Sequence, residues 1–166
     1  MPFEKPIGTF MHPLDRYEVV RTDATILAAM QRMRRSLKNG GPSPLIVVSE
    51  TPAGNETIQG FVTPEDLVFG IADPFLKGAE RMGPIFFEGL LEAEYRQAEQ
   101  KTVAEIMSPV SASIDEEEML MEAIFLMNRH HVRLMPVTRN EEVTGVVHLE
   151  DIYREVLNRT ARSKIR

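Results

Sequence analysis

A hydroxyl and a carboxylate stand three residues apart in the stretch GFVTPEDL, which runs from Gly60 to Leu67. Thr63 can both donate and accept a hydrogen bond, whereas an ionised Asp66 only accepts. The same residues also suit a helix start, because threonine caps free amides, Pro64 fits the first helical position and acids are favoured at the positive end of the helix dipole. The residue types therefore predict a helix start, and they leave open whether Thr63 and Asp66 also hold a ligand.

The sequence contains no arrangement of residues that is typical of catalysis. Cysteine is absent, which excludes disulfides, thiolate metal ligands and a cysteine nucleophile. The motifs GxSxG, GxGxxG and HExxH and the phosphate-binding P-loop are also absent. No spacing of acids completes a metal site around the four histidines, which are His12, His130, His131 and His148. We expect neither an enzyme nor a metal centre.

The composition is that of a globular protein, with 166 residues of which 43% are apolar. A net charge of −6 argues against nucleic-acid binding, and we interpret the basic stretches 32–38 and 159–166 as a solvated helix face and a terminal tail. The apolar run at 45–48 is far too short to cross a bilayer, and residues 1–15 have acids and prolines where a signal peptide has a basic and an apolar segment. We expect a cytoplasmic location and no membrane partner.

Four segments recur in the same order, which indicates two copies of one structural unit. FMHPL at 10–14 resembles IMSPV at 106–110, ATILAAMQRM at 24–33 resembles EMLMEAIFLM at 118–127, PLIVVSE at 44–50 resembles LMPVTRN at 134–140, and GFVTPEDL at 60–67 resembles GVVHLEDI at 145–152. The copies differ mainly in the length of their loops, and lengthening a loop has only a small entropic cost.

Each copy is predicted to form a helix, two strands joined by a turn, and a second helix. In the second copy Asp115 is a candidate cap for a helix with an apolar stripe at helical spacing, which consists of Leu120, Ala123, Ile124 and Met127. Met121 and Phe125 lie beside this stripe, so the helix has more apolar surface than one core contact requires. The apolar stretches 133–138 and 143–148 flank RNEE and predict an antiparallel hairpin.

The residues between the copies predict an additional helical segment. Its first part is interrupted by Pro74, Gly78, Gly83 and Pro84. Residues 85–100 then have a helical pattern with several large apolar side chains, which would either cover the paired sheets or contribute to a subunit interface. Thr102 and Glu105 next predict a capping box at the start of a short helix.

These repeated features resemble a tandem pair of CBS domains, often called a Bateman module. Each copy has x-M-x-P in front, an apolar helix, LIVV or LMPV in a strand, and a closing glycine and aspartate in the pattern G-h-h-x-x-x-D, where h is apolar. The resemblance implies an α/β (α+β) fold in which two β-α-β-β-α units pack sheet to sheet about a pseudo-twofold axis, with an inserted connector helix. The implied boundaries are 7–71 for the first unit, 72–100 for the connector, 101–160 for the second unit and 161–166 for a basic tail.

The resemblance also implies a ligand and a set of binding residues. Members of the family bind AMP, ADP, ATP or S-adenosylmethionine in clefts between the units, where a hydroxyl-bearing residue and an aspartate three positions later meet phosphate and ribose. In this chain those positions are Thr63 and Asp66. An ionised Asp66 can accept both ribose hydroxyls, while Thr63 and nearby amides can donate to phosphate. A capped helix without a ligand is the alternative.

In the second copy Asp151 is in place, but His148 stands where threonine or serine is expected. As imidazolium, His148 could pair with phosphate, and that binding would weaken as the pH rises through roughly 6.5; a structural histidine at a strand end is the alternative. Arg133 could aim at phosphate or lie on the surface of a strand. Tyr17 could stack on a base or simply pack.

The sequence and the resemblance together predict a stand-alone CBS-pair regulatory module. It would bind an adenine nucleotide or S-adenosylmethionine as a regulatory ligand, not as a cofactor, and signal to a separate effector protein. It would form a homodimer through the CBS helices, which would bury Met121 and Phe125. The alternative is a structural dimerisation scaffold whose ligand clefts are vestigial.

Overall fold

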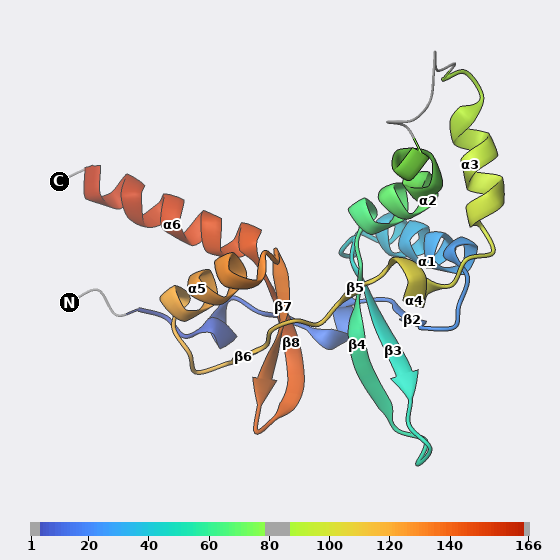
Figure 1. The fold of residues 1–166 in the computed structure, drawn as a ribbon. Helices are drawn as coiled ribbons and strands as arrows, with labels where there is room; N and C mark the ends of the chain where they lie inside the picture. Colours follow the sequence, from blue (N-terminus) through green and yellow to red (C-terminus); the bar gives the residue numbers. More distant parts are fainter. Residues whose placement is uncertain (1–3, 79–86, 165–166) are drawn as a thin grey trace. The chain divides into compact units, whose positions relative to one another are not determined.

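The computed structural model describes residues 4–78 and 87–164, which fall into two compact units (Figure 1). One unit comprises residues 17–109, and the other combines the residues before Tyr17 with those from Val110 onward. Each unit has a four-stranded mixed sheet with helices packed on it, so the predicted α/β fold is confirmed. The sheet-to-sheet packing of the units about a pseudo-twofold axis stays a prediction.

The unit of residues 17–109 has the sheet order β2-β3-β4-β5, in which β2 and β3 are parallel and the other pairs are antiparallel. Its elements are β2 (Val19–Arg21), α1 (Ile26–Lys38), β3 (Leu45–Glu50), β4 (Glu56–Val62), α2 (Pro64–Gly78), α3 (Leu90–Ala98), α4 (Val103–Ile106) and β5 (Ser108–Pro109). Apolar residues of all four helices pack with β2, β3 and β4 in one core. The capping box predicted for α4 is confirmed, since the Glu105 carboxylate accepts the amide of Thr102 at 2.7 Å.

The other unit has the sheet order β1-β8-β7-β6, in which β6 and β7 are parallel and the other pairs are antiparallel. Its elements are the 3-10 turns η1 (Ile7–Thr9) and η2 (Leu14–Arg16), the strands β1 (His12–Pro13), β6 (Ile114–Asp115), β7 (Leu134–Arg139) and β8 (Glu142–His148), and the helices α5 (Leu120–His130) and α6 (Leu149–Lys164). Ile7 is fully buried in the core of this unit, which shows that the leading segment of the chain is part of it.

The two x-M-x-P segments each pair with the sheet of the other copy. His12 and Pro13 lie opposite Val146 and Gly145 on β8, and β5 lies beside β4 in the same way. The predicted boundaries 7–71 and 101–160 describe the repeats in the sequence, and they stay a prediction. In the compact units, the segment that precedes each repeat pairs with the sheet of the other repeat.

The glycine of each closing motif lets such a segment approach. A Cβ added to Gly60 would lie 2.3 Å from the carbonyl oxygen of Ser108, and one added to Gly145 would lie 2.6 Å from that of His12. Both distances are shorter than any normal contact, so only glycine fits at these two positions without a shift of the backbone.

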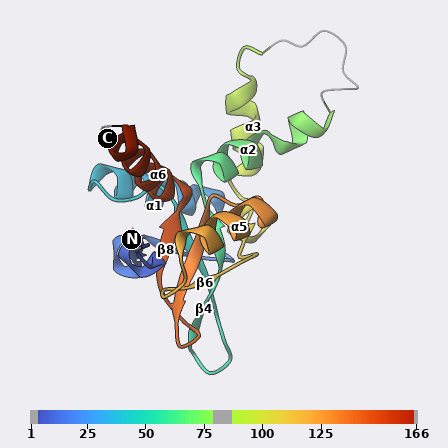
Figure 2. The same cartoon turned by 90° about the vertical axis from the view of Figure 1, so that its left-hand side faces the viewer.

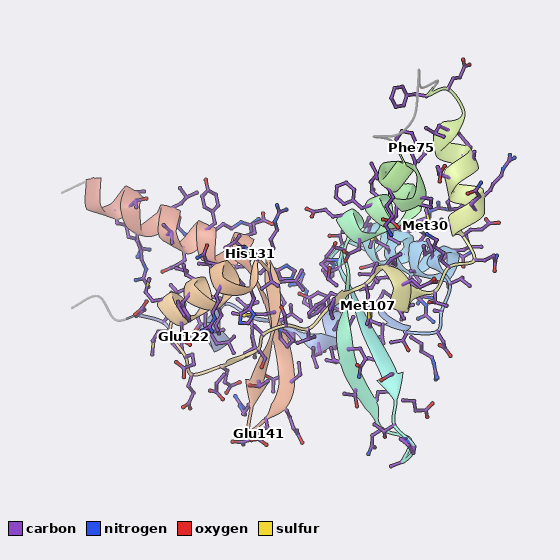
Figure 3. All side chains as sticks on the ribbon, in the orientation of Figure 1. Met30, Phe75, Met107, Glu122, His131 and Glu141 are labelled. Carbon is purple, nitrogen blue, oxygen red and sulfur yellow. The ribbon has the colours of Figure 1, made fainter. Side chains whose placement is uncertain are left out.

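The two predicted hairpins form and share one irregularity. The ladder of β3 and β4 has a register shift after Val47, and that of β7 and β8 has one after Val137. The β7–β8 hairpin turns through Asn140 and Glu141, which both have positive φ angles, of 50° and 68°. Figure 3 labels Glu141 at the tip of this hairpin. Two central residues with positive φ define a type I′ turn, which matches the twist of the strands.

Helix α5 has the predicted apolar stripe but begins later than Asp115. Leu120, Ala123 and Met127 are buried, and Phe125 beside the stripe is exposed as expected. Asp115 lies at the end of β6, where its carboxylate accepts the amide of Glu117 at 2.9 Å. This contact makes a turn ahead of the helix, so Asp115 is not the helix cap.

The connector differs from the prediction because α2 continues past Pro74 to Gly78. The predicted boundary at 71/72 therefore falls inside a helix. Helix α3 begins at Leu90 and packs beside α2, as Figure 2 also shows. Its Ala98 is fully buried in the core of the unit, which favours the covering role for this helix. Gly83, Pro84 and the other residues of 79–86 lie outside the described residues.

At the other end, α6 runs to Lys164. Most of the predicted basic tail at 161–166 is thus the last turn of a helix.

Candidate functional site

Thr63 and Asp66 cap the start of α2 reciprocally. The Asp66 amide donates to the Thr63 hydroxyl at 3.2 Å, and the Thr63 amide donates to Oδ2 of Asp66 at 2.9 Å. The hydroxyl of Ser108 on β5 donates to Oδ1 of the same carboxylate at 2.8 Å. Two donors, one from the β4–α2 junction and one from β5, therefore meet at one carboxylate.

Thr63 and Asp66 therefore form the helix cap that the sequence predicts. The same geometry is also compatible with ligand binding. A carboxylate oxygen has more than one lone pair, so two oxygens with one contact each can accept further hydrogen bonds. Asp66 is half-buried, which leaves part of its side chain accessible. The ligand role of Thr63 and Asp66 stays a prediction.

In the other unit a cluster of charged and aromatic residues occupies the equivalent place. Nε2 of His12 lies 2.7 Å from Oδ2 of Asp151, and Nδ1 of His12 lies 2.9 Å from Nη1 of Arg16. A guanidinium can only donate, so Nδ1 of His12 must be the acceptor and Nε2 must carry the proton that is donated to Asp151. The ring of His148 packs edge-on against that of His12, with centroids 5.3 Å apart.

The surroundings of His148 favour its neutral form. Burial lowers the pKa of His148, and the neighbouring His12 lowers this pKa further; Asp151 and Glu150 oppose the shift without reversing it. A neutral imidazole has no charge to pair with phosphate. The direction of the shift therefore favours the structural alternative for His148 over the imidazolium interpretation.

The lowered pKa predicts how stability depends on pH. Because folded His148 binds a proton less readily than unfolded histidine, whose pKa is near 6.5, its contribution to stability is complete above pH 6.5. It is lost as the pH falls below 6.5 and through the lower pKa of folded His148. We expect the free energy of unfolding to decrease more from pH 7.5 to 5.5 in the wild type than in a His148→Gln variant, as measured by urea denaturation. His130→Gln, at the exposed end of α5, is the control and should keep the wild-type difference; equal losses in wild type and His148→Gln would contradict the prediction.

Arg133 and Tyr17 lie in different surroundings. Arg133 is exposed just ahead of β7, and its carbonyl oxygen accepts the amide of Leu149 at 2.7 Å. It is thus next to the first turn of α6, in the same unit as His148 and Asp151. Tyr17 is only 6% exposed, which favours packing over stacking on a base. The ligand roles of both residues stay predictions.

Three residues of these clusters were missed by the analysis of the sequence. Ser108 and His12 stand at the same position of the repeated segments IMSPV and FMHPL, and each contacts the aspartate of the sheet it joins. The repeat itself therefore carried a signal for them. Nothing in the sequence indicated Arg16, which reaches His12 from the following turn. Within residues 4–78 and 87–164 no group of three or more histidines and acids is placed to hold a metal ion.

Comparisons with known proteins agree with this architecture. Residues 103–158 match the family model of the CBS domain. An uncharacterized protein of Bacillus subtilis, YlbB, is 26% identical over 129 residues, which are 77% of this chain and 70% of that protein. The CBS-pair protein CBSX2 of Arabidopsis thaliana has a similar structure, with a TM-score of 0.66, 18% identity and coverage of 96% of this chain and 99% of that one.

Two structures of such proteins contain nucleotides. One is CBSX2 in complex with AMP, with a TM-score of 0.61, 18% identity and coverage of 94% of this chain and 98% of that one. The other is the CBS domain of a bacterial CNNM/CorC family Mg²⁺ transporter in complex with ATP, with a TM-score of 0.63, 19% identity and coverage of 92% and 87%.

The chain therefore contains a CBS domain in residues 103–158 and has the fold of a CBS-pair protein over nearly its whole length. In the part of the chain that the structure describes, no helix is both long and apolar enough to span a membrane.

Proposed function

We propose that this CBS-pair protein binds an adenine nucleotide or a related adenosine compound as a regulatory ligand, with Asp66 as the acceptor for the ribose hydroxyls. The observation that carries the proposal is the half-buried Asp66 carboxylate at the N-terminus of α2, next to the Thr63 hydroxyl. Structural relatives of the same fold contain AMP and ATP, which supports this ligand class.

The chemistry of the α2 start suits such a ligand. A ribose has two neighbouring hydroxyls that can donate to one ionised carboxylate, as the free lone pairs of Asp66 allow. Phosphate oxygens need donors, and the amides of the first turn of α2 and the Thr63 hydroxyl can supply them. The positive end of the helix dipole also favours the phosphate charge. Ligand binding would then be reported to a separate effector protein.

Thermal unfolding with and without ligands tests the proposal. The compounds are AMP, ADP, ATP, S-adenosylmethionine and NAD at millimolar concentration, with GMP as the control for the base. A ligand at a hundred times its Kd adds about 2.7 kcal/mol to the free energy of unfolding, which raises the Tm of a chain of this size by roughly 5–10 °C. No rise with any adenosine compound would contradict the proposal and favour the scaffold.

The scaffold alternative rests on a different observation. Both oxygens of Asp66 already have hydrogen-bond donors within the chain, so the aspartate is explained without a ligand. The ligand-binding module and the scaffold have one feature in common, since we propose a homodimer through the CBS helices in either case. On α5 and α6, Met121, Phe125 and Tyr153 are each more than half exposed, and burying such side chains against a second copy would be favourable.

A charge placed on this surface should separate the dimer. In Phe125→Glu a charge would replace an apolar side chain in the interface, and an aromatic hot-spot residue of an interface contributes at least about 2 kcal/mol, or roughly thirtyfold in Kd. We expect sedimentation at micromolar concentration to give a dimer for the wild type and for the apolar control Phe125→Leu, and a monomer for Phe125→Glu. A monomeric wild type would contradict both functions.

A further inference from the structure

The two aspartates that close the repeated motifs have different partners. Asp66 accepts the hydroxyl of Ser108, whereas Asp151 accepts the ring N–H of His12. Ser108 and His12 are equivalent residues of the two copies, since IMSPV and FMHPL are repeats of each other. The contrast is therefore between the same position in two copies of one unit.

Ser108 can give way to a ligand or share the carboxylate with it. Its side chain is exposed and reorients by rotation about single bonds. A hydroxyl both donates and accepts, so Ser108 could donate to the oxygen of a ribose hydroxyl that has taken its place on Asp66.

His12 is held in place from three sides. Its Nε2 donates to Asp151 at 2.7 Å and its Nδ1 accepts from Arg16 at 2.9 Å, so both ring nitrogens are used. The His148 ring packs against the third side, where the other copy has the smaller Thr63. A ligand that needed Oδ2 of Asp151 would have to displace the His12 ring, whose other nitrogen is held by Arg16.

We propose that Asp151 is a structural anchor, and that the chain therefore binds one nucleotide, at Asp66, and not two. This inference rests on the proposed function. Through His12, Asp151 attaches β1 and the turn η2 to the start of α6. His12 is the residue that makes the two copies unequal, because its ring lies on Oδ2 of Asp151 and is itself held by Arg16, where the other copy has the rotatable hydroxyl of Ser108.

Calorimetric titration of the whole chain with AMP tests the number of sites. We expect one AMP for each wild-type chain, a loss of at least tenfold in affinity for Asp66→Ala, and less than a twofold change with unaltered stoichiometry for Asp151→Ala. The double variant His12→Ser/His148→Thr gives the second copy the residues of the first, and we expect it to bind two AMP for each chain. Two sites in the wild type, or an affinity loss in Asp151→Ala equal to that in Asp66→Ala, would overturn the inference.

A second measurement tests the anchor without any ligand. In urea unfolding, His12→Ala and Asp151→Ala should each lower the midpoint, and the double variant His12→Ala/Asp151→Ala should lower it no further than the worse single variant, because both remove the same contact. Midpoint shifts that add up in the double variant, or an unchanged midpoint in Asp151→Ala, would overturn the proposed anchoring role of Asp151. If the wild type binds no adenosine compound while these midpoints behave as expected, the proposed function fails and the anchor stands.

Discussion

An Asp66→Ala substitution is expected to weaken the binding of AMP by roughly tenfold to a hundredfold. Hydrogen bonds to a charged group contribute about 1.5–3 kcal/mol each, and a loss of 1.4 kcal/mol is a tenfold change in Kd. Alanine would remove the acceptor for the ribose hydroxyls and the partner of the Ser108 hydroxyl at once. Titration calorimetry on the purified chain measures the effect.

The matched control is Glu65→Ala. Glu65 lies in the same first turn of α2 and has the same charge, so its removal takes the same negative charge away from that turn without removing the proposed acceptor. We expect a change of less than about fivefold, since one charge near a helix terminus contributes about 0.3–1 kcal/mol. If Asp66→Ala kept the wild-type affinity, or if both variants lost the same amount, Asp66 would not be the specific acceptor.

Gly60→Ala is expected to be among the most destabilising small substitutions in the chain. The added Cβ would lie 2.3 Å from the Ser108 carbonyl oxygen and 3.0 Å from Cα of Pro109. Both atoms belong to the backbone of β5, which cannot rotate away as a side chain does. Overpacking of this kind costs about 1–3 kcal/mol, which for a chain of this size lowers the Tm by roughly 2–12 °C.

Gly78→Ala provides the comparison for this effect. Gly78 ends α2, and a Cβ added there has open space around it. Because alanine favours helix more than glycine does, we expect no loss of Tm in this variant. Differential scanning calorimetry of Gly60→Ala, Gly78→Ala and wild type gives the result, and a Gly60→Ala protein as stable as wild type would show that β5 does not approach β4 as described.

Local pattern in the sequence was sufficient for most helices and strands. The stripe of Leu120, Ala123 and Met127 has helical period and forms the buried face of α5, and the apolar stretches around RNEE form a hairpin. Local rules failed at two places. The Asp115 carboxylate accepts an amide two residues later and forms a turn instead of a helix cap, and α2 continues through Pro74 although proline disfavours a helix interior.

The partners of the candidate site could not be read from local pattern, because they come from distant parts of the chain. His12 and Asp151 are 139 residues apart, and Ser108 and Asp66 are 42 residues apart. Sequence repetition shows that the x-M-x-P segments are equivalent, but it does not say which copy's sheet each segment joins. Only the pairing of β1 with β8 and of β5 with β4 brings each segment to its aspartate.

A crystal structure of the chain with AMP tests the central claim most directly. The account predicts that both ribose hydroxyls lie within hydrogen-bond distance of the Asp66 carboxylate, while His12 keeps its contact with Asp151. AMP bound through other residues, with Asp66 still holding only Thr63 and Ser108, would contradict it.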